Sequence, residues 1–206
     1  MRWMIVLPSM PLRNPNVSLV YHGQHFSEEE CDSIVASATD SEWQEGGVGG
    51  YGENKAAPSV VGKVRSCLEQ RLHIDQRTGA PLNKISNEIC AVNSNGWRFE
   101  LSGFVADDMP YIMRYPHSMN GHNDWHVDMG RSYAASRKLA FSIQLSNSED
   151  YEGGNLEFHN VNIDPNSLRK KGTLALFPTY WLHQVGLVTK GTRDAIVGWV
   201  HGPSFR

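Results

Sequence analysis

The pattern of hydrophobic and polar positions divides the chain near Gly96. Before this point, apolar residues recur every three to four positions, which is the spacing of one face of an α-helix. Ser27 and Glu30 fit a capping box, in which each side chain bonds to the backbone N–H of the other residue, and they mark a helix start. The pattern predicts three helices, near residues 28–39, 58–72 and 83–95.

After Gly96 the helical period disappears, and short apolar runs take its place. Each run is bounded by Gly, Pro, Asn, Asp or Ser, which are typical of turns between strands. Helices followed by many short strands predict an α+β protein whose strands form a sandwich or barrel and not a βαβ sheet. The predicted strands cover residues 97–104, 111–115, 122–128, 138–145, 155–158, 173–177, 183–188 and 193–200.

The N-terminal apolar run from Trp3 to Leu7 ends at Pro8. It is too short for the core of a signal peptide, and we predict that it forms an extended first strand. No later stretch approaches the length of a membrane span. We therefore expect a soluble, cytoplasmic protein without a membrane partner.

Length and composition fit one large domain. The 206 residues are 40% hydrophobic, which excludes a disordered or collagen-like chain. We expect a single domain, 1–206, with a helix-rich supporting region, 1–96, and a strand-rich core, 97–206. The net charge of −3 provides no global positive field, so nucleic acid is not an expected partner. The three cysteines lack CxxC spacing, and we interpret them as reduced thiols.

Residues 47–52 match the glycine pattern G-x-G-x-x-G of dinucleotide-binding proteins. That pattern works only between a strand and a helix, whose N-terminus then faces the pyrophosphate. Here a predicted helix precedes it and no βαβ unit surrounds it, so we reject nucleotide binding. Our hypothesis is that either this glycine-rich loop, 46–52, or the turn 107–110 closes over a substrate.

The pattern His-x-Asp occurs at His73, at His122 and at His126. Residues i and i+2 point apart on a helix but share a face of a strand, where both can reach one metal ion. His73 ends a predicted helix, so we expect it to be a surface residue. The predicted strand 122–128 holds the other two pairs, on one face.

His183, directly after an apolar strand, is the best candidate for a third ligand. Two imidazoles and one carboxylate on one face of an octahedron leave three open positions, which suits Fe(II) oxygenases. Arg193 lies on the last predicted strand, where its two-pronged guanidinium could hold the distal carboxylate of an oxo-acid.

At this point the chain resembles the Fe(II)/2-oxoglutarate dioxygenases, and within them the prolyl 4-hydroxylase-like branch with its bacterial PKHD-type members. The resemblance spans about residues 111–200 and follows the order of the family's motifs. It implies a double-stranded β-helix (a jelly-roll, cupin-like barrel) with N-terminal supporting helices. The matching segments are Trp125 to Asp128, Arg137 to Ser142, Tyr151 to Phe158, Lys171 to Pro178, Leu182-His183 and Gly191 to Arg193.

The resemblance also implies roles for individual residues. The iron ligands would be His126, Asp128 and His183, and Arg193 would pair with the distal carboxylate of 2-oxoglutarate. Tyr115 would donate a hydrogen bond to this co-substrate, and Trp199 would line the pocket. The pair His122 and Asp124 competes with His126 and Asp128, but Trp125 and the spacing to Arg137 favour the second pair.

The implied activity is hydroxylation of an unactivated C–H bond with O2, coupled to decarboxylation of 2-oxoglutarate to succinate and CO2. The implied cofactors are Fe(II), 2-oxoglutarate and, as a reductant, ascorbate. By analogy we expect prolyl residues of a peptide or protein as the substrate. The alternatives are a free amino acid or small metabolite, or a metal-binding β-barrel without catalysis. A cupin-like isomerase would need a His-x-His pattern that the chain does not show near residues 122–128.

Overall fold

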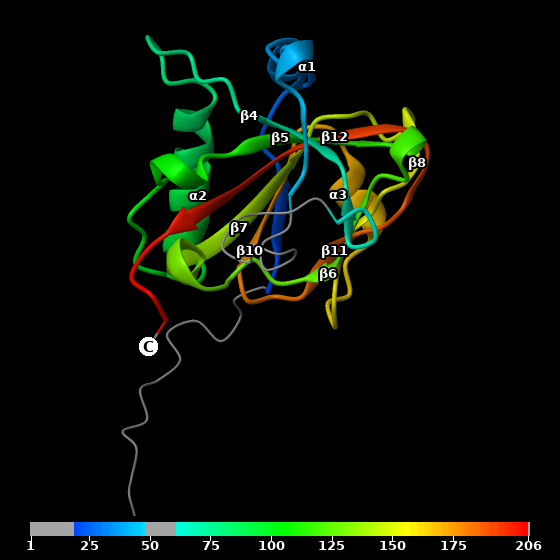
Figure 1. The fold of residues 1–206 in the computed structure, drawn as a ribbon. Helices are drawn as coiled ribbons and strands as arrows, with labels where there is room; N and C mark the ends of the chain where they lie inside the picture. Colours follow the sequence, from blue (N-terminus) through cyan, green and yellow to red (C-terminus); the bar gives the residue numbers. More distant parts are fainter. Residues whose placement is uncertain (1–18, 48–60, 206) are drawn as a thin grey trace, which may run out of the picture.

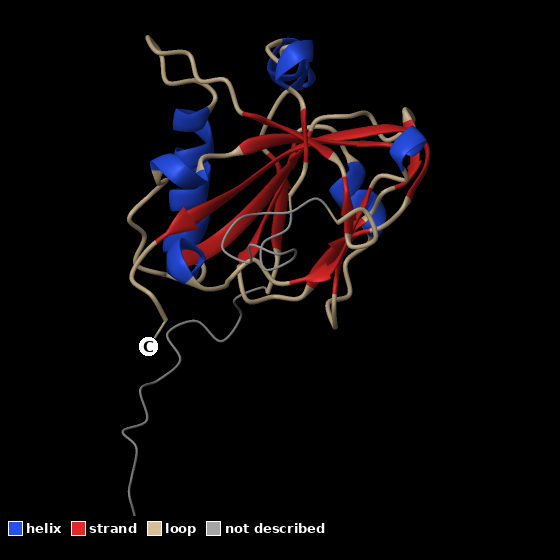
Figure 2. Ribbon diagram, viewed as in Figure 1, coloured by secondary structure: helices blue, strands red, loops and turns tan. Residues whose placement is uncertain are grey.

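The computed structural model describes residues 19–47 and 61–205, and they form two β-sheets flanked by helices (Figures 1 and 2). The large sheet has the order β1-β10-β7-β12-β5-β4-β2, and β8 also pairs with β12. Its strands are β1 (Tyr21–Gln24), β10 (Thr173–Pro178), β7 (Arg137–Gln144), β12 (Val188–His201), β5 (Tyr111–Pro116), β4 (Leu68–Arg71), β2 (Gln44–Glu45) and β8 (Tyr151–Gly153).

The small sheet has the order β3-β6-β11-β9. Its strands are β3 (Arg65–Ser66), β6 (His122–His126), β11 (His183–Val185) and β9 (Leu156–Phe158). The helices are α1 (Glu28–Ala36), α2 (Leu82–Asn95) and α3 (Pro165–Arg169). The expected α+β class is therefore confirmed, although the described strands form two sheets and no closed barrel.

The large sheet is buried on both faces, and neighbouring residues of its strands belong to two different cores. In β7, Leu139 and Phe141 pack with α1 and α2, whereas Ala140 between them packs toward the small sheet. The same alternation occurs in β10, where Leu174 and Ala175 take opposite sides. Alternate side chains of a strand point to opposite faces, so continuous apolar runs are what a doubly covered sheet requires. Figure 1 shows α2 along one side of the sheet and β6 and β11 on the other.

Two of the three predicted helices are confirmed. Helix α1 begins with the predicted capping box, because the Ser27 hydroxyl accepts from the Glu30 N–H (3.2 Å) and the Glu30 carboxylate accepts from the Ser27 N–H (2.8 Å). Helix α2 ends at Asn95, directly before the predicted stop at Gly96.

The predicted helix 58–72 is wrong over its described part, residues 61–72. This segment forms β3 and β4, which pair with β6 and β5. Its buried residues are Cys67, Gln70 and Leu72, which do not follow the helical stripe of the sequence. Pairing with two other strands outweighs a local helical pattern, because propensity is weak compared with tertiary packing.

The predicted strand 97–104 is also wrong, since only an isolated bridge from Gly103 to His201 forms there. The Asn93 side chain bonds to both backbone groups of Phe99, at 2.9 and 3.0 Å, and so replaces strand partners. Each of the seven other predicted strands coincides with an observed one, although β6 ends at His126. The predicted first strand, Trp3 to Leu7, lies outside the described residues. Among the described helices, none has the length and apolar character needed to cross a membrane.

The backbone of Gly172 packs closely against the segment that follows β1, and its carbonyl oxygen accepts hydrogen bonds from the N–H groups of His25 and Phe26. Its replacement by alanine tests how much stability this contact provides. Its φ is +82°, and an added Cβ would collide with the backbone carbonyl oxygen of Phe26. We expect Gly172→Ala to lower the free energy of unfolding in urea by at least about 2 kcal/mol. Gly62→Ala is the control, because no atom lies within 4 Å of its Cβ position. Equal unfolding midpoints for the two variants would contradict the prediction.

Candidate metal centre and active site

Two histidines lie opposite each other on neighbouring strands of the small sheet. His126 ends β6 and His183 begins β11, and the register pairs them directly. Their ring centroids are 4.2 Å apart. Directly opposite residues of an antiparallel pair bring their side chains together, so the ladder itself holds the two imidazoles at one place.

Asp128 completes a group of three. Its Oδ1 lies 3.5 Å from His126 Nε2, and its Oδ2 lies 3.5 Å from His183 Nε2. The three ligand atoms lie within 4.8 Å of one another. Among the described residues, His126, Asp128 and His183 are the group that could hold a metal ion. Metal bonds of about 2.0–2.2 Å to nitrogen and oxygen place neighbouring ligand atoms roughly 3–3.5 Å apart, so the 3.5 Å separations between Asp128 and the two imidazoles suit one ion.

Each imidazole is oriented by the same kind of hydrogen bond. The Nδ1 of His126 bonds to the carbonyl oxygen of Asp124 (2.7 Å), and the Nδ1 of His183 bonds to that of Trp181 (2.9 Å). A carbonyl only accepts, so Nδ1 carries the proton in both rings and Nε2 keeps a lone pair for a metal.

The charges of the group favour a bound cation. Burial disfavours the ionised form of Asp128, but the positive charges that His183 and His126 carry when they are protonated outweigh it and hold the pKa of this carboxyl well below its usual range. Burial lowers the pKa of His183. For His126, burial is outweighed by Asp128, and the pKa is raised. A metal ion therefore meets an anionic carboxylate and competes with a proton at His126.

The prediction that both His-x-Asp pairs of 122–128 share one face is wrong. His183 is opposite His126 but Val185 is opposite Asn123, so β6 contains one extra residue, a β-bulge. The bulge puts Asn123 and His126 on the same face, where their side chains are 3.2 Å apart. Neighbours in a strand alternate, so His122 points away from the group. Asp128 itself lies beyond the end of β6.

His73 and Asp75 are exposed, as expected, although they follow a strand and not a helix. Asp75 closes a local turn by accepting from the N–H of Thr78 (2.7 Å).

Arg193 is a buried cation in the core between the two sheets. It is 3% exposed, and β12 places it opposite Tyr115 of β5. Its Nε donates to Gln144 Oε1 (3.1 Å), and its guanidinium lies 5.6 Å from the centre of the Tyr115 ring. Within the described ranges, Arg193 has no carboxylate partner. A buried charge is normally paired, so this arrangement is typical of a site for an anionic ligand.

Tyr115 and Trp199 belong to the same core as the residues packed around His183. Burial raises the pKa of Tyr115, which keeps its hydroxyl protonated and able to donate. The indole N–H of Trp199 is buried without a hydrogen-bond partner among the described residues. This indole also contributes to the lowered pKa of Asp128.

Two neighbours of the group were not predicted. The amide of Asn123 contacts Nε2 of His126, and Arg137 Nη1 donates to the backbone oxygen of Asp128 (3.0 Å). No pattern of the sequence could show the first contact, since it depends on the bulge. Arg137 belongs to a segment that carries the family resemblance, but that resemblance assigned it no function.

The structure does not support a lid at the turn 107–110. Asp108 is 3% exposed and accepts two hydrogen bonds from Arg137, at 2.6 and 2.7 Å. The turn is therefore fixed to β7. The other candidate lid, 46–52, lies outside the described residues from Val48 onward.

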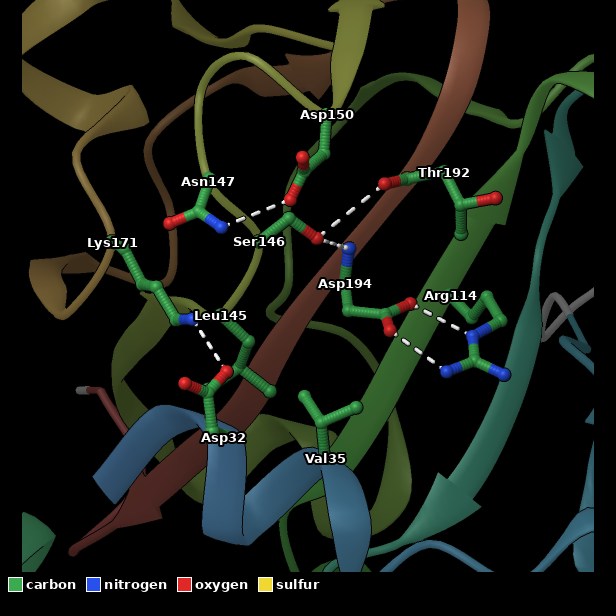
Figure 3. Close-up of a pocket in the computed structure, with 10 residues that line it drawn as sticks. All are labelled: Asp32, Val35, Arg114, Leu145, Ser146, Asn147, Asp150, Lys171, Thr192 and Asp194. Atoms are coloured by element: carbon green, nitrogen blue, oxygen red, sulfur yellow. Dashed lines mark hydrogen bonds and ion pairs between the residues drawn. The ribbon is translucent and has the colours of Figure 1, made fainter. Parts of the chain in front are cut away.

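A pocket of about 420 Å³ lies elsewhere, beside α1 (Figure 3). None of the six candidate site residues lines it. Four of its five charged side chains form ion pairs, Lys171 with Asp32 and Arg114 with Asp194, and the fifth, Asp150, accepts a hydrogen bond from the Asn147 amide (3.0 Å). Among the described residues, the pocket therefore offers no unpaired cation to an anionic ligand.

A partly buried group of two histidines and one carboxylate between two facing sheets defines a candidate mononuclear metal enzyme. Residues 111–201, which include the whole group, match the family model of the 2OG-Fe(II) oxygenase superfamily. The match covers less than half of the chain, and together with the relatives described next it confirms the expected class of Fe(II)- and 2-oxoglutarate-dependent dioxygenase.

The relatives indicate the branch. A PKHD-type hydroxylase of Prochlorococcus marinus strain NATL1A is 26% identical over 85% of this chain and 74% of its own length. A PKHD-type hydroxylase of strain MIT 9301 is 33% identical over 43% of this chain, which spans only 40% of that relative. A prolyl hydroxylase from Trichoplax adhaerens, in complex with a peptide fragment of the hypoxia inducible factor oxygen degradation domain, shares the fold. Its TM-score is 0.63, at 20% identity over 91% of this chain and 86% of that one.

These findings confirm the resemblance to the PKHD-type, prolyl-hydroxylase-like branch and the double-stranded β-helix fold. The structural neighbour shows the fold alone, because its sequence identity is low.

Removal of His183 tests whether the three side chains hold a metal. We expect His183→Ala to weaken Mn(II) or Co(II) binding more than about 100-fold. Loss of a residue that only supports a ligand lowers metal affinity by about 10- to 100-fold, so loss of a ligand should cost more. Isothermal titration would measure the dissociation constants. His73→Ala, at the exposed His-x-Asp pair, is the control and should bind like the unaltered protein. Similar constants for both variants would refute the assignment.

Proposed function

We propose that this protein is an Fe(II)- and 2-oxoglutarate-dependent hydroxylase acting on prolyl residues of a peptide or protein. The observation that carries the proposal is the combination of the three-ligand group with Arg193, a buried cation that has no carboxylate partner among the described residues. In one core, the three ligands would bind a metal ion and Arg193 would bind a carboxylate of the co-substrate.

His126, Asp128 and His183 would hold the iron through Nε2, a carboxylate oxygen and Nε2. Two neutral imidazoles and a carboxylate suit Fe(II) and leave open positions for further ligands. When bound, the iron supplies the activation of O2 and the oxidation of 2-oxoglutarate, which no side chain can perform.

The protein's own contribution is orientation and exclusion of water. Arg193 would bind the distal carboxylate of 2-oxoglutarate through the two outer nitrogens of its guanidinium, since Nε already bonds to Gln144. The protonated hydroxyl of Tyr115 would donate a hydrogen bond to the same ligand. Trp199 would cover one wall near Asp128. Hydrogen bonds from Nδ1 to backbone carbonyl oxygens keep both imidazoles fixed, so little reorganisation accompanies ligand binding.

A rim of exposed aromatic residues favours a peptide over a small metabolite as the substrate. Trp125 is 44% exposed next to His126, and its ring contacts His159 at 6.0 Å. The Trp181 N–H donates to the His159 carbonyl (3.1 Å), and Tyr180 lies beside Trp181. Tyr180 also contacts Phe205 at 5.7 Å. Exposed, connected apolar side chains are typical of surfaces that bind other chains. The named prolyl hydroxylase neighbour, which is in complex with a peptide, supports the same choice.

The proposal also covers the domain organisation, the reductant and the location of the protein. We propose that residues 1–206 act as a single domain, because β1 and β12 share one sheet. Ascorbate as a reductant and a cytoplasmic location remain predictions. Cys31, Cys67 and Cys90 are free in the described structure.

The binding of 2-oxoglutarate can be tested before any substrate is known. Without oxygen, Fe(II) and 2-oxoglutarate together should produce a weak visible charge-transfer band. We expect Arg193→Met to raise the 2-oxoglutarate dissociation constant at least about 30-fold, since loss of one partner of a buried charge pair costs about 2–5 kcal/mol. Arg71→Met, at an exposed position on β4, should leave the constant unchanged. The absence of any band in the unaltered protein would refute the function.

The choice of substrate is tested by a screen of proline-containing peptides and free amino acids. We expect a mass gain of one oxygen atom on a prolyl residue, together with succinate. Trp125→Ala should then raise KM for the peptide several-fold and leave the charge-transfer band intact, because Trp125 lies on the rim and not at the metal. Oxygen incorporation only into free amino acids would overturn the peptide assignment. A stable metal complex without succinate formation would favour the non-catalytic alternative.

A further inference from the structure

The position of Asp128 depends on interactions outside the strand that carries His126. Asp128 lies beyond the last residue of β6, so the ladder that fixes His126 does not reach it. Yet its two carboxylate oxygens must face two different imidazoles, each at 3.5 Å. Something outside the strand has to fix its backbone.

Two hydrogen bonds fix the backbone of Asp128 from opposite sides. Its N–H donates to the carbonyl oxygen of Thr179 (2.8 Å), and its own carbonyl oxygen accepts from Arg137 Nη1 (3.0 Å). The Thr179 hydroxyl in turn donates to the carbonyl oxygen of Arg137 (2.8 Å). Asp128, Thr179 and Arg137 thus form a closed ring of hydrogen bonds at the start of β7.

We infer that Arg137 is a positioning residue for the metal ligand Asp128, held in turn by Asp108 and His201. This inference rests on the proposed metal site. Arg137 touches no imidazole and does not coordinate, so it acts only through the geometry of Asp128.

Arg137 is itself immobilised. Its Nε and Nη2 donate to the two oxygens of Asp108, at 2.7 and 2.6 Å, and leave Nη1 free to reach Asp128. The Asp108 carboxylate also accepts from Nε2 of His201 (2.9 Å), whose Nδ1 bonds to the Ser136 hydroxyl (2.8 Å). The planar guanidinium therefore uses all three nitrogens at once, which a lysine cannot do.

Trp199 packs against the same guanidinium. The Arg137 guanidinium lies 3.7 Å from the centre of the indole ring. Movement of Arg137 would therefore disturb this indole as well as the backbone of Asp128.

A stabilising role alone explains this arrangement poorly. Buried ion pairs lose on desolvation much of what they gain by attraction, so the Arg137–Asp108 pair adds little net stability. What it does fix is the position of Nη1 against the backbone of a proposed ligand.

The chain contains a matched control pair on the other face of the same sheet. Arg114 also binds an aspartate with two hydrogen bonds, to Asp194 at 2.9 and 2.8 Å, and also stacks on a tryptophan, Trp43, at 4.4 Å (Figure 3 shows the ion pair). It has no contact with the three-ligand group. A comparison of Arg137→Gln with Arg114→Gln therefore separates positioning of Asp128 from general loss of an Arg–Asp pair.

The test measures Co(II) binding to the full chain, by titration and by the visible spectrum of the bound ion. We expect Arg137→Gln to weaken binding about 10- to 100-fold and to alter the spectrum, as loss of an outer-shell partner does. Arg137→Lys should remain weakened, because charge without the planar fork does not restore the geometry. Arg114→Gln should lower the melting temperature but bind Co(II) as the unaltered protein does.

Should Arg137→Gln fail to fold, Asp108→Asn leaves Arg137 in place, loosens it, and should also weaken Co(II) binding. Unchanged Co(II) affinity in every folded variant at Arg137 and Asp108 would overturn the inference, and so would equal weakening by Arg114→Gln. If the unaltered protein binds no metal, it is the proposed function that fails, which this design shows separately.

Discussion

The direct pairing of His126 with His183 across β6 and β11 is the constraint on which the candidate site depends. Backbone hydrogen bonds of the ladder hold the two residues opposite each other, and bonds from Nδ1 to local carbonyl oxygens turn both Nε2 atoms toward Asp128. The precision of the site comes from the backbone, because a ladder position has less freedom than a long side chain on a loop. Only Asp128 lies outside the ladder, and the fold surrounds it with additional hydrogen bonds.

The core between the two sheets concentrates charge where most proteins place none. The side chains of Asp128 and Arg193 are both largely inaccessible to water. Burial of either charge without a partner would lower the stability of the folded protein. The other core, beneath α1 and α2, is built from aliphatic and aromatic side chains. The large sheet thus separates two tasks, since one face supplies stability through apolar burial and the other carries the polar site at some cost to stability.

The bulge in β6 shows how one residue changes a site. With regular alternation, His122 and His126 would share a face, and the two His-x-Asp pairs would be equivalent. The extra residue moves Asn123 onto the inner face instead and leaves His122 outside. The bulge therefore selects one of two nearly identical pairs as a ligand pair, and it adds an amide beside the proposed metal position.

The sequence alone determined the class of fold, most of the strands after Gly96 and the identities of the three candidate ligands. These features leave local traces, namely apolar runs, turn residues, His-x-Asp spacing and the ordered motifs of a family. The tertiary structure alone decided that 61–72 forms strands, that 97–104 does not, and that Asp128 depends on Arg137 and Thr179. Those outcomes depend on partners far away along the chain, because backbone groups pair with whichever element packs beside them, and no local pattern records which element that is.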